Sequence, residues 1–166
     1  MRSFCPRCGA PWRQANICAR CHLQWWENPV PAACAVAYRD GCYLALKRST
    51  EPYINQWDFP GGFVDPEERI EDALRRELLE EVGLQVASMT YLGSWPDEYT
   101  DLCNVFETRN VLNVYFLVAL QGTDSLVPSI EGDPAWISID ELSAALAFPR
   151  SNRPAISTHR QLLEMD

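Results

Sequence analysis

No stretch of the 166-residue sequence approaches the ~18–20 consecutive apolar residues that a membrane-spanning helix requires. The first five residues also lack the apolar run of a secretory signal, so we expect a cytoplasmic protein with no membrane partner. Low-complexity segments and internal repeats are not apparent either. With 47% hydrophobic and 22% charged residues, the composition indicates an ordinary globular domain with a small appendage rather than a disordered chain.

Positive charge is in short supply, because 14 lysines and arginines face 23 acidic residues and give a net charge of −9. Non-specific nucleic-acid binding needs a positive face, so nucleic acid is not an expected partner. The charge is also uneven. Residues 1–26 contain four arginines and no acid, whereas residues 67–81 contain seven acids and three arginines. We therefore expect two modules, and an acidic site acting on an anionic substrate would need metal cations.

Four of the seven cysteines form two Cys-x-x-Cys units, Cys5/Cys8 and Cys18/Cys21, with nine residues between the units. Each unit can present two thiolates from a tight turn, and two units complete a tetrahedral four-sulfur zinc site. A segment this short cannot build a hydrophobic core. Bound Zn²⁺ would therefore supply its folding energy. A ligand role for His22 and a redox dithiol are the alternatives. The pattern favours a structural zinc ribbon.

The rest of the chain alternates strand-like and helix-like segments. Strands are predicted at residues 33–38, 42–47, 85–92, 111–120 and 136–137, with Asp40-Gly41 as a hairpin turn and residues 49–59 as a loop. Helices are predicted at residues 67–82, from Ser138 onward and near residues 152–154. This alternation predicts an α/β fold with a mixed sheet between helical layers. We expect a zinc ribbon over residues 1–27 and the α/β domain over residues 31–166.

The helix at residues 67–82 carries the clearest end signals. Asp65 is predicted as its N-cap, Pro66 as its first residue, and Glu68 as the partner in a capping box. Gly83 is predicted to end the helix in a left-handed conformation.

Three glutamates on this helix, Glu77, Glu80 and Glu81, are spaced so that their carboxylates share one face. Adjacent anions are destabilising unless cations bind them, and oxygen ligands favour hard ions such as Mg²⁺ or Mn²⁺. The alternative for a glutamate-rich segment is an ordinary solvated helix face.

The wider spacing resolves this alternative. Gly62, five residues, Glu68, seven residues and then the segment from Arg76 to Leu84 match the Nudix signature G-x5-E-x7-R-E-U-x-E-E-x-G-U at every fixed position, where U is a bulky aliphatic residue. The chain resembles a Nudix hydrolase over about residues 31–153. Its ribbon is similar to that of zinc-containing members such as the NADH pyrophosphatases. The resemblance implies a Nudix α/β/α sandwich and metal-dependent hydrolysis of a nucleotide's diphosphate linkage.

By matching positions, the resemblance implies that Glu77 and Glu81 are the main ligands of Mg²⁺ or Mn²⁺, with Glu80 assisting. Glu68 would support the metal site, and Arg76 would hold a glutamate in place. Such metals neutralise charge that develops on the phosphates and lower the pKa of the attacking water.

Further contacts are predicted outside the signature. Gly61 would offer a backbone carbonyl to the metal, and Glu131 would bring an extra acid from a later loop, with Glu98, Asp101 and Glu107 as alternatives. Arg48 is a candidate contact for phosphate, and surface exposure is its alternative. Trp57 and Tyr99 are candidates for stacking on a base, and core or lid packing is their alternative.

The substrate is read from weaker motifs. NADH pyrophosphatases carry a Ser-Gln-Pro-Trp motif after the signature, whereas residues 93–99 read Gly-Ser-Trp-Pro-Asp-Glu-Tyr, with the order changed. Residues 148–154 are similar to the base-contacting end of MutT-type triphosphatases. We expect a dinucleotide such as NADH or FAD, or ADP-ribose, as substrate. The alternatives are a nucleoside triphosphate and a non-catalytic nucleotide sensor that binds RNA or protein. A homodimer, common in the family, is left open.

Overall fold

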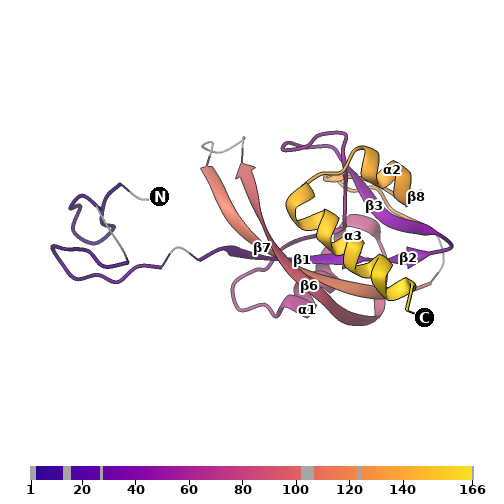
Figure 1. The fold of residues 1–166 in the computed structure, drawn as a ribbon, viewed down its shortest axis with the longest axis horizontal. Helices are drawn as coiled ribbons and strands as arrows, with labels where there is room; N and C mark the ends of the chain where they lie inside the picture. The colour runs from indigo at the N-terminus through magenta and orange to yellow at the C-terminus, as the bar shows by residue number, and fades with distance from the viewer. Residues whose placement is uncertain (1–2, 13–15, 27, 102–106, 123–124, 166) are drawn as a thin grey trace.

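The computed structural model describes residues 3–12, 16–26, 28–101, 107–122 and 125–165. Within these ranges the chain forms β1 (Val30–Val36), β2 (Tyr38–Arg39), β3 (Cys42–Arg48), β4 (Trp57–Asp58), β5 (Gly61–Phe63), α1 (Ile70–Val82), β6 (Gln85–Asp101), β7 (Glu107–Gln121), β8 (Gly132–Ser138), α2 (Ile139–Ala144) and α3 (Pro149–Leu163) (Figure 1). None of the described helices combines the length and apolarity needed to cross a bilayer.

Two sheets form the centre of the main body. One sheet has the strand order β5-β1-β7-β6, in which β1 and β7 run parallel and the other neighbours run antiparallel. In the other sheet, β3 pairs antiparallel with β2, β4 and β8. The predicted mixed sheet is confirmed. The predicted hairpin is confirmed too, because Asp40 and Gly41 both adopt positive φ between Arg39 and Cys42, which pair with each other.

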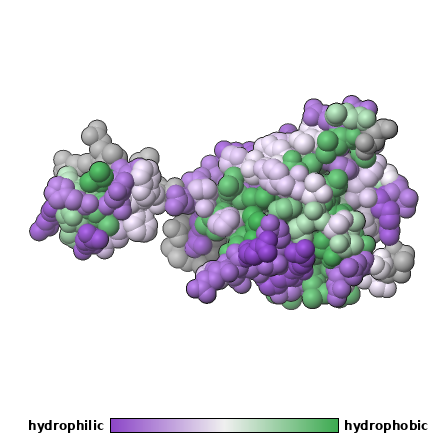
Figure 2. Space-filling model, turned by 90° about the horizontal axis from the view of Figure 1, so that it is seen from below, coloured by the Kyte–Doolittle hydropathy of each residue, from purple (hydrophilic) through white to green (hydrophobic). Residues whose placement is uncertain are grey.

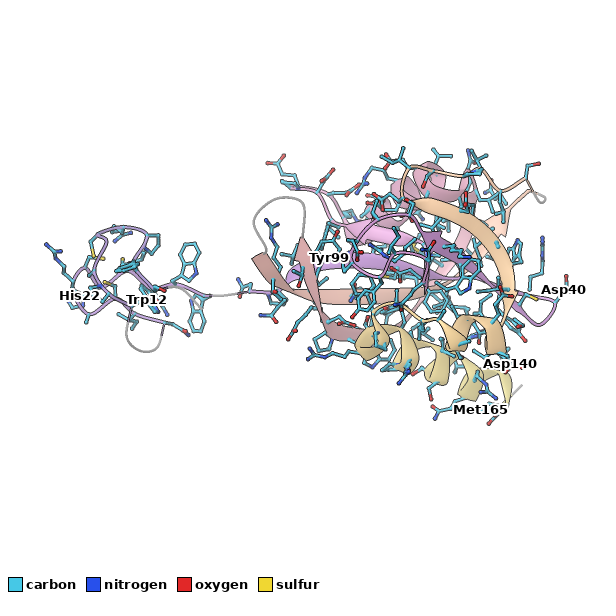
Figure 3. The ribbon with its side chains drawn as sticks, turned by 90° about the horizontal axis from the view of Figure 1, so that it is seen from above. Trp12, His22, Asp40, Tyr99, Asp140 and Met165 are labelled. Atoms are coloured by element: carbon cyan, nitrogen blue, oxygen red, sulfur yellow. The ribbon has the colours of Figure 1, made fainter. Side chains whose placement is uncertain are left out.

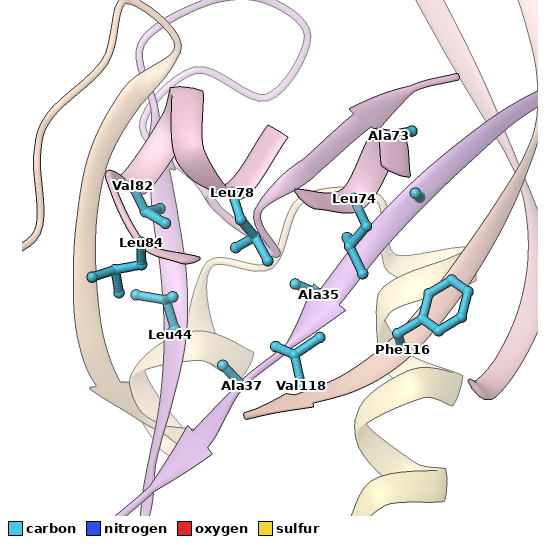
Figure 4. Packing of buried hydrophobic residues seen from close by; sticks show 11 residues of the cluster. Ala35, Ala37, Leu44, Ala73, Leu74, Leu78, Val82, Leu84, Phe116 and Val118 are labelled. Carbon is cyan, nitrogen blue, oxygen red and sulfur yellow. The ribbon is translucent and has the colours of Figure 1, made fainter. Parts of the chain in front are cut away.

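Helices cover both faces of this sheet layer. Alternate residues of β1 point to opposite faces, as the pleat requires. Ala33 and Ala35 pack toward α1, in a cluster with Leu74 and Leu78 that Figure 4 shows. Val36 packs on the other face in a second cluster that includes residues of α2 and α3. The small alanine side chains let α1 lie close to the sheet, and the result is the predicted α/β/α arrangement.

Helix α1 begins later than predicted. It starts at Ile70, and Arg69, not Asp65, is its N-cap, without a side-chain cap. Glu67 adopts φ 68, a left-handed conformation that a right-handed helix cannot include. Residues 65–68 instead form a turn in which the Asp65 N–H donates to the Glu68 carboxylate at 3.1 Å. The predicted end is confirmed, because Gly83 adopts φ 73.

Two other element boundaries differ from the prediction. Strand β6 continues through Pro96 to Asp101, because residues 93–101 pair with β7 across the sheet. Helix α3 begins at Pro149, a few residues earlier than expected. The start of α2 agrees with the prediction, since the Ser138 hydroxyl accepts the N–H of Glu141 at 3.2 Å.

The N-terminal segment lies apart from the main body and consists of two equivalent turns (Figure 1). In residues 3–12, the N–H of Gly9 donates to the Cys5 carbonyl at 2.9 Å, and in residues 16–25, the N–H of His22 donates to the Cys18 carbonyl at 2.9 Å. Gly9 and His22 both have positive φ. The two Cys-x-x-Cys units identified in the sequence therefore adopt the same turn.

Candidate functional site

A pocket of about 410 Å³ lies where α1, the first sheet and the N-terminus of α3 meet. Its lining includes carboxylates, among them Glu77 of the signature and Glu131, and aromatic rings, among them Tyr99 and Phe148. On the face shown in Figure 2, which is the side of α1 in Figure 1, a strongly hydrophilic band runs beside hydrophobic surface. The pocket lining itself combines charged and apolar residues, as ligand sites commonly do.

Glu81 is the most buried carboxylate of the signature, with a relative exposure of 4%. Its Oε2 accepts the backbone N–H of Gly61 at 2.7 Å. Burial, together with the neighbouring Glu131 and Glu77 carboxylates, raises the pKa of Glu81 to about 9. A buried carboxylate surrounded by two others is costly for the protein alone, and a bound cation would remove much of that cost.

Glu77 lies against the backbone of Gly62, which explains the glycine at that position of the signature. A Cβ on Gly62 would lie 2.5–3.0 Å from the Glu77 carboxylate atoms. Glu77 is half-buried, and burial raises the pKa of its carboxyl group. Gly61, which precedes Gly62, has φ 146, and its Cα lies too close to the Ala33 carbonyl for any side chain to fit.

Arg76 ties three glutamates together. Its Nε and Nη2 donate to the two Glu68 oxygens at 3.1 and 3.0 Å, and its Nη1 donates to Glu77 at 2.7 Å and to Glu80 at 3.4 Å. The paired guanidinium lowers the pKa of Glu68. Glu80 is the exposed member of the set, since 59% of its side chain is accessible. The arginine therefore fixes the carboxylates beside the pocket, as the sequence motif suggested.

Glu131, predicted from a later loop, lies beside Glu81 and lines the pocket. Its loop is attached to the end of β3, because its carbonyl accepts the N–H of Ser49 at 2.9 Å and the Ile130 carbonyl accepts the Ser49 hydroxyl at 2.7 Å. Gly132 packs on the Lys47 carbonyl, where no side chain would fit. Of the alternatives, Glu98 lines the pocket and pairs with Arg150 at 3.0 Å. The side chains of Asp101 and Glu107 lie outside the described residues.

Arg48 lines the pocket and is one end of a hydrogen-bonded chain of side chains. Its Nη1 donates to Asp58 Oδ2 at 3.1 Å, and its Nε donates to the Pro52 carbonyl at 2.8 Å. Asn152 donates to Asp58 Oδ1 at 2.9 Å and accepts the Tyr115 hydroxyl at 2.7 Å. Only 12% of the Arg48 side chain is accessible. Among the described residues its Nη2 has no hydrogen-bond partner, which leaves it available to an anion in the pocket.

The two aromatic candidates are placed differently. Tyr99 lines the pocket, and Figure 3 labels it in the main body. Trp57 is not among the pocket-lining residues and packs with the second core cluster, where Lys47 Nζ lies 5.7 Å from its ring. Several pocket-lining residues were not predicted as site residues, Asp58 and Asp97 among them, and Phe148 was predicted only as part of the segment 148–154. The proline after Phe148 was a signal for it, because proline restricts the residue before it.

The four ribbon cysteines converge on one point. Their sulfur atoms all lie within 4.8 Å of one another, with Cys5 and Cys21 at 3.6 Å and Cys8 and Cys18 at 3.7 Å. Four thiols at this spacing can hold one metal ion. The His22 side chain is exposed and does not belong to the cluster.

Comparisons with known proteins agree with this geometry. The nucleoside triphosphatase NudI of Salmonella arizonae is 47% identical over 55 residues, which cover 32% of this chain and 39% of the relative. NudI of Salmonella newport gives the same values. The chain thus spans about two fifths of the curated relatives it matches.

Solved structures cover more of the fold. The MutT Nudix hydrolase of Burkholderia pseudomallei has a TM-score of 0.63 at 28% identity, covering 80% of this chain and 98% of that one. The Nudix domain of Shewanella oneidensis NrtR, complexed with ADP ribose, has a TM-score of 0.65 at 22% identity, covering 83% and 90%. A family model described as the NUDIX domain matches residues 28–158. This match spans most of the sequence and includes the carboxylate pocket, so the chain belongs to the Nudix family.

Proposed function

We propose that the chain hydrolyses the diphosphate linkage of a nucleoside diphosphate derivative, such as a dinucleotide or ADP-ribose, with Mg²⁺ or Mn²⁺. The observation that carries this proposal is the buried Glu81 carboxylate with Glu77 and Glu131 beside it in the pocket. Such a cluster is unfavourable without a counter-charge, and its all-oxygen donor set fits a hard divalent cation.

The signature residues have separate roles in this proposal. Glu77 and Glu81 would be the main metal ligands, and the more exposed Glu80 would assist, together with the Gly61 carbonyl. When bound, the cations neutralise charge on the phosphates and lower the pKa of the attacking water. Arg76, held by Glu68 in a two-point contact, keeps Glu77 oriented toward the pocket.

Three pocket residues would act on the substrate directly. Glu131 is the candidate general base, because it lies beside Glu81 on a loop attached to β3. Arg48 would bind phosphate through Nη2, which has no partner among the described residues, and Tyr99 would lie against the base. Trp57 is not proposed as a substrate contact, because it packs against the second core cluster.

Turnover of a substrate panel tests the proposal. Purified protein with Mg²⁺ or Mn²⁺ is incubated with NADH, FAD, ADP-ribose, coenzyme A and the nucleoside triphosphates, and the products are identified by mass spectrometry. Release of a nucleoside monophosphate from a dinucleotide or from ADP-ribose is the expected result. If the protein hydrolyses none of the panel, the enzymatic function is wrong, and a nucleotide-sensing role becomes the better explanation.

A second candidate is hydrolysis of a nucleoside triphosphate, which the NudI relatives favour. Within the segment 148–154, the structure argues against a base contact through the Asn152 side chain. Both ends of the Asn152 amide are already bonded, to Asp58, Ala147 and Tyr115. Pyrophosphate as the product, in the same panel, would favour this candidate.

The ribbon is proposed to bind one structural Zn²⁺, because four thiolates leave no open coordination position for catalysis. Residues 1–27 and 31–166 are proposed as separate units, and the ribbon offers an exposed surface for homodimer formation. Sedimentation of the full chain with and without chelator tests whether the metal supports a dimer.

A further inference from the structure

Several of the side chains that line the pocket are aromatic, Phe63, Tyr99 and Phe148 among them. The Tyr99 and Phe148 rings face each other with 17° between their planes and 6.0 Å between their centroids. Phe63 packs edge-on against Tyr99 at 5.4 Å, and Tyr53 packs edge-on against Phe148 at 4.8 Å. The Arg48 guanidinium lies 5.0 Å from the Phe148 ring. The facing pair is thus supported at its edges by other side chains.

Phe148 reaches this position through an unusual backbone conformation. It has φ 43 and ψ 58, a left-handed conformation that bulky side chains rarely adopt. Pro149 follows it and keeps it out of the right-handed helical region. Local strain of this kind persists where the surroundings enforce it, and it is concentrated at ligand sites.

Asp97 enforces the conformation from the neighbouring strand. It is 4% exposed, and its Oδ2 accepts both the N–H and the hydroxyl of Ser151 at 3.0 Å. Ser151 in turn donates its N–H to the Phe148 carbonyl at 3.2 Å. Asp97 Oδ1 accepts the N–H of Glu98 at 2.8 Å, so both carboxylate oxygens are used within the protein. Asp97 stands two residues before Tyr99, and one strand therefore carries both Tyr99 and the anchor of Phe148.

We propose that Tyr99 and Phe148 form a stacking site for the nucleobase of the substrate, and that Asp97 is a positioning residue that holds Phe148 in this site. The inference rests on the proposed function, because it takes the pocket to be the nucleotide site. Both rings line the pocket and lie 17° from parallel, so a planar base in the pocket can stack on either ring.

Binding of AMP and of ribose 5-phosphate to the full chain, measured by calorimetry without added divalent metal, tests the site independently of turnover. The two ligands share a sugar phosphate and differ in the base. The variants are Tyr99→Leu, Phe148→Leu and Phe148→Trp. Tyr91→Leu, in an exposed aromatic on the same strand, is the matched control.

The wild type is expected to bind AMP more tightly than ribose 5-phosphate. Stacking on an aromatic side chain accounts for roughly 5- to 100-fold in affinity, so Tyr99→Leu and Phe148→Leu are each expected to lose such a factor for AMP and none for ribose 5-phosphate. Phe148→Trp retains a ring and is expected to retain AMP binding, and Tyr91→Leu is expected to match the wild type.

Asp97→Asn tests the positioning role. It is expected to weaken AMP binding, and it should add no further loss in the Phe148→Leu background, because it acts through that ring. An added loss there would overturn the positioning role.

The stacking site is overturned if the wild type shows no preference for AMP, or if the leucine variants bind AMP unchanged or lose both ligands equally. Tyr99→Leu lies on a strand and keeps the test valid if Phe148→Leu unfolds. If the binding ratios change as expected in a protein that hydrolyses nothing, the proposed function fails and the stacking site stands.

Discussion

The backbone N–H of Gly61 donates to Oε2 of Glu81 at 2.7 Å, so an edge strand fixes a carboxylate that a helix supplies. This bond holds the Glu81 carboxylate against β5, and burial raises the pKa of Glu81 to about 9. Glu80, one residue earlier, is exposed and makes only a 3.4 Å contact with Arg76. The two neighbouring glutamates should therefore differ in their effect on catalysis.

Replacing Glu81 with Gln is expected to lower kcat by about 10²–10⁴, because a buried charged ligand is lost. Glu80→Gln is expected to have a smaller effect, since its side chain is solvated. Steady-state kinetics with the best substrate of the panel measures both. A loss of less than tenfold for Glu81→Gln would contradict its role as a main metal ligand.

Gly62→Ala is expected to lower kcat by about tenfold or more without unfolding the protein, because the new Cβ would displace the Glu77 carboxylate. Gly62 is not among the glycines with positive φ, so the substitution tests steric displacement and not backbone strain. Gly122→Asn serves as control, because that glycine has open space and asparagine tolerates its left-handed backbone. Equal kinetics for the two variants would show that Glu77 tolerates the displacement.

Asp58→Asn is expected to raise KM roughly tenfold with little change in kcat, because Arg48 loses the charge that orients it in the pocket. Arg48→Met should raise KM at least as much. The double variant should be no worse than Arg48→Met alone, since Asp58 acts through the arginine. Additive effects in this cycle would mean that Asp58 affects binding by another route.

His159 should make stability depend on pH. It is buried, its Nδ1 lies 3.0 Å from the Tyr43 hydroxyl, and burial lowers its pKa below 6.5. The unfolded chain therefore binds a proton at this histidine more readily than the folded protein, and the contribution of His159 to stability is lost as the pH falls below about 6.5. Urea unfolding between pH 5 and 8 measures the loss. His159→Gln should show a smaller loss over this interval, whereas identical pH profiles would contradict the assignment.

Mass spectrometry under native conditions should detect one zinc per chain, and Cys8→Ser should lose it. No described ribbon residue lines the pocket, so this variant should retain the kcat of the wild type if it remains monodisperse. A disulfide among the four cysteines, with no metal, would contradict the zinc assignment.

The sequence predicted the parts of the site that depend on local spacing. Gly62, Glu68, Arg76 and Glu77 lie on β5, the following turn and α1, which are consecutive in the chain, so their contacts follow from their spacing. The fold class was also predictable, because helical and strand periodicities alternate. The start of α1 was not, since the left-handed Glu67 overrides a convincing capping pattern.

The aromatic end of the pocket depends on pairings across the fold. Asp97 meets Ser151 only because α3 packs beside β6, and nothing in either local sequence specifies this contact. Trp57 was a reasonable stacking candidate by residue type, but it is partly buried and packs against the second core cluster. Residue type alone does not tell a buried aromatic from one in the pocket wall.

The parallel pairing of β1 with β7 constrains how the protein can fold during synthesis. Val30 faces Val111, so the floor of the pocket joins segments from opposite halves of the chain. Such non-local pairing is slow to form, and it cannot begin until the later strand has left the ribosome. The ribbon, whose thiols span only residues 5–21, can close on a metal ion long before that. The nascent chain should therefore carry a folded, metal-bound end while its pocket is still unmade.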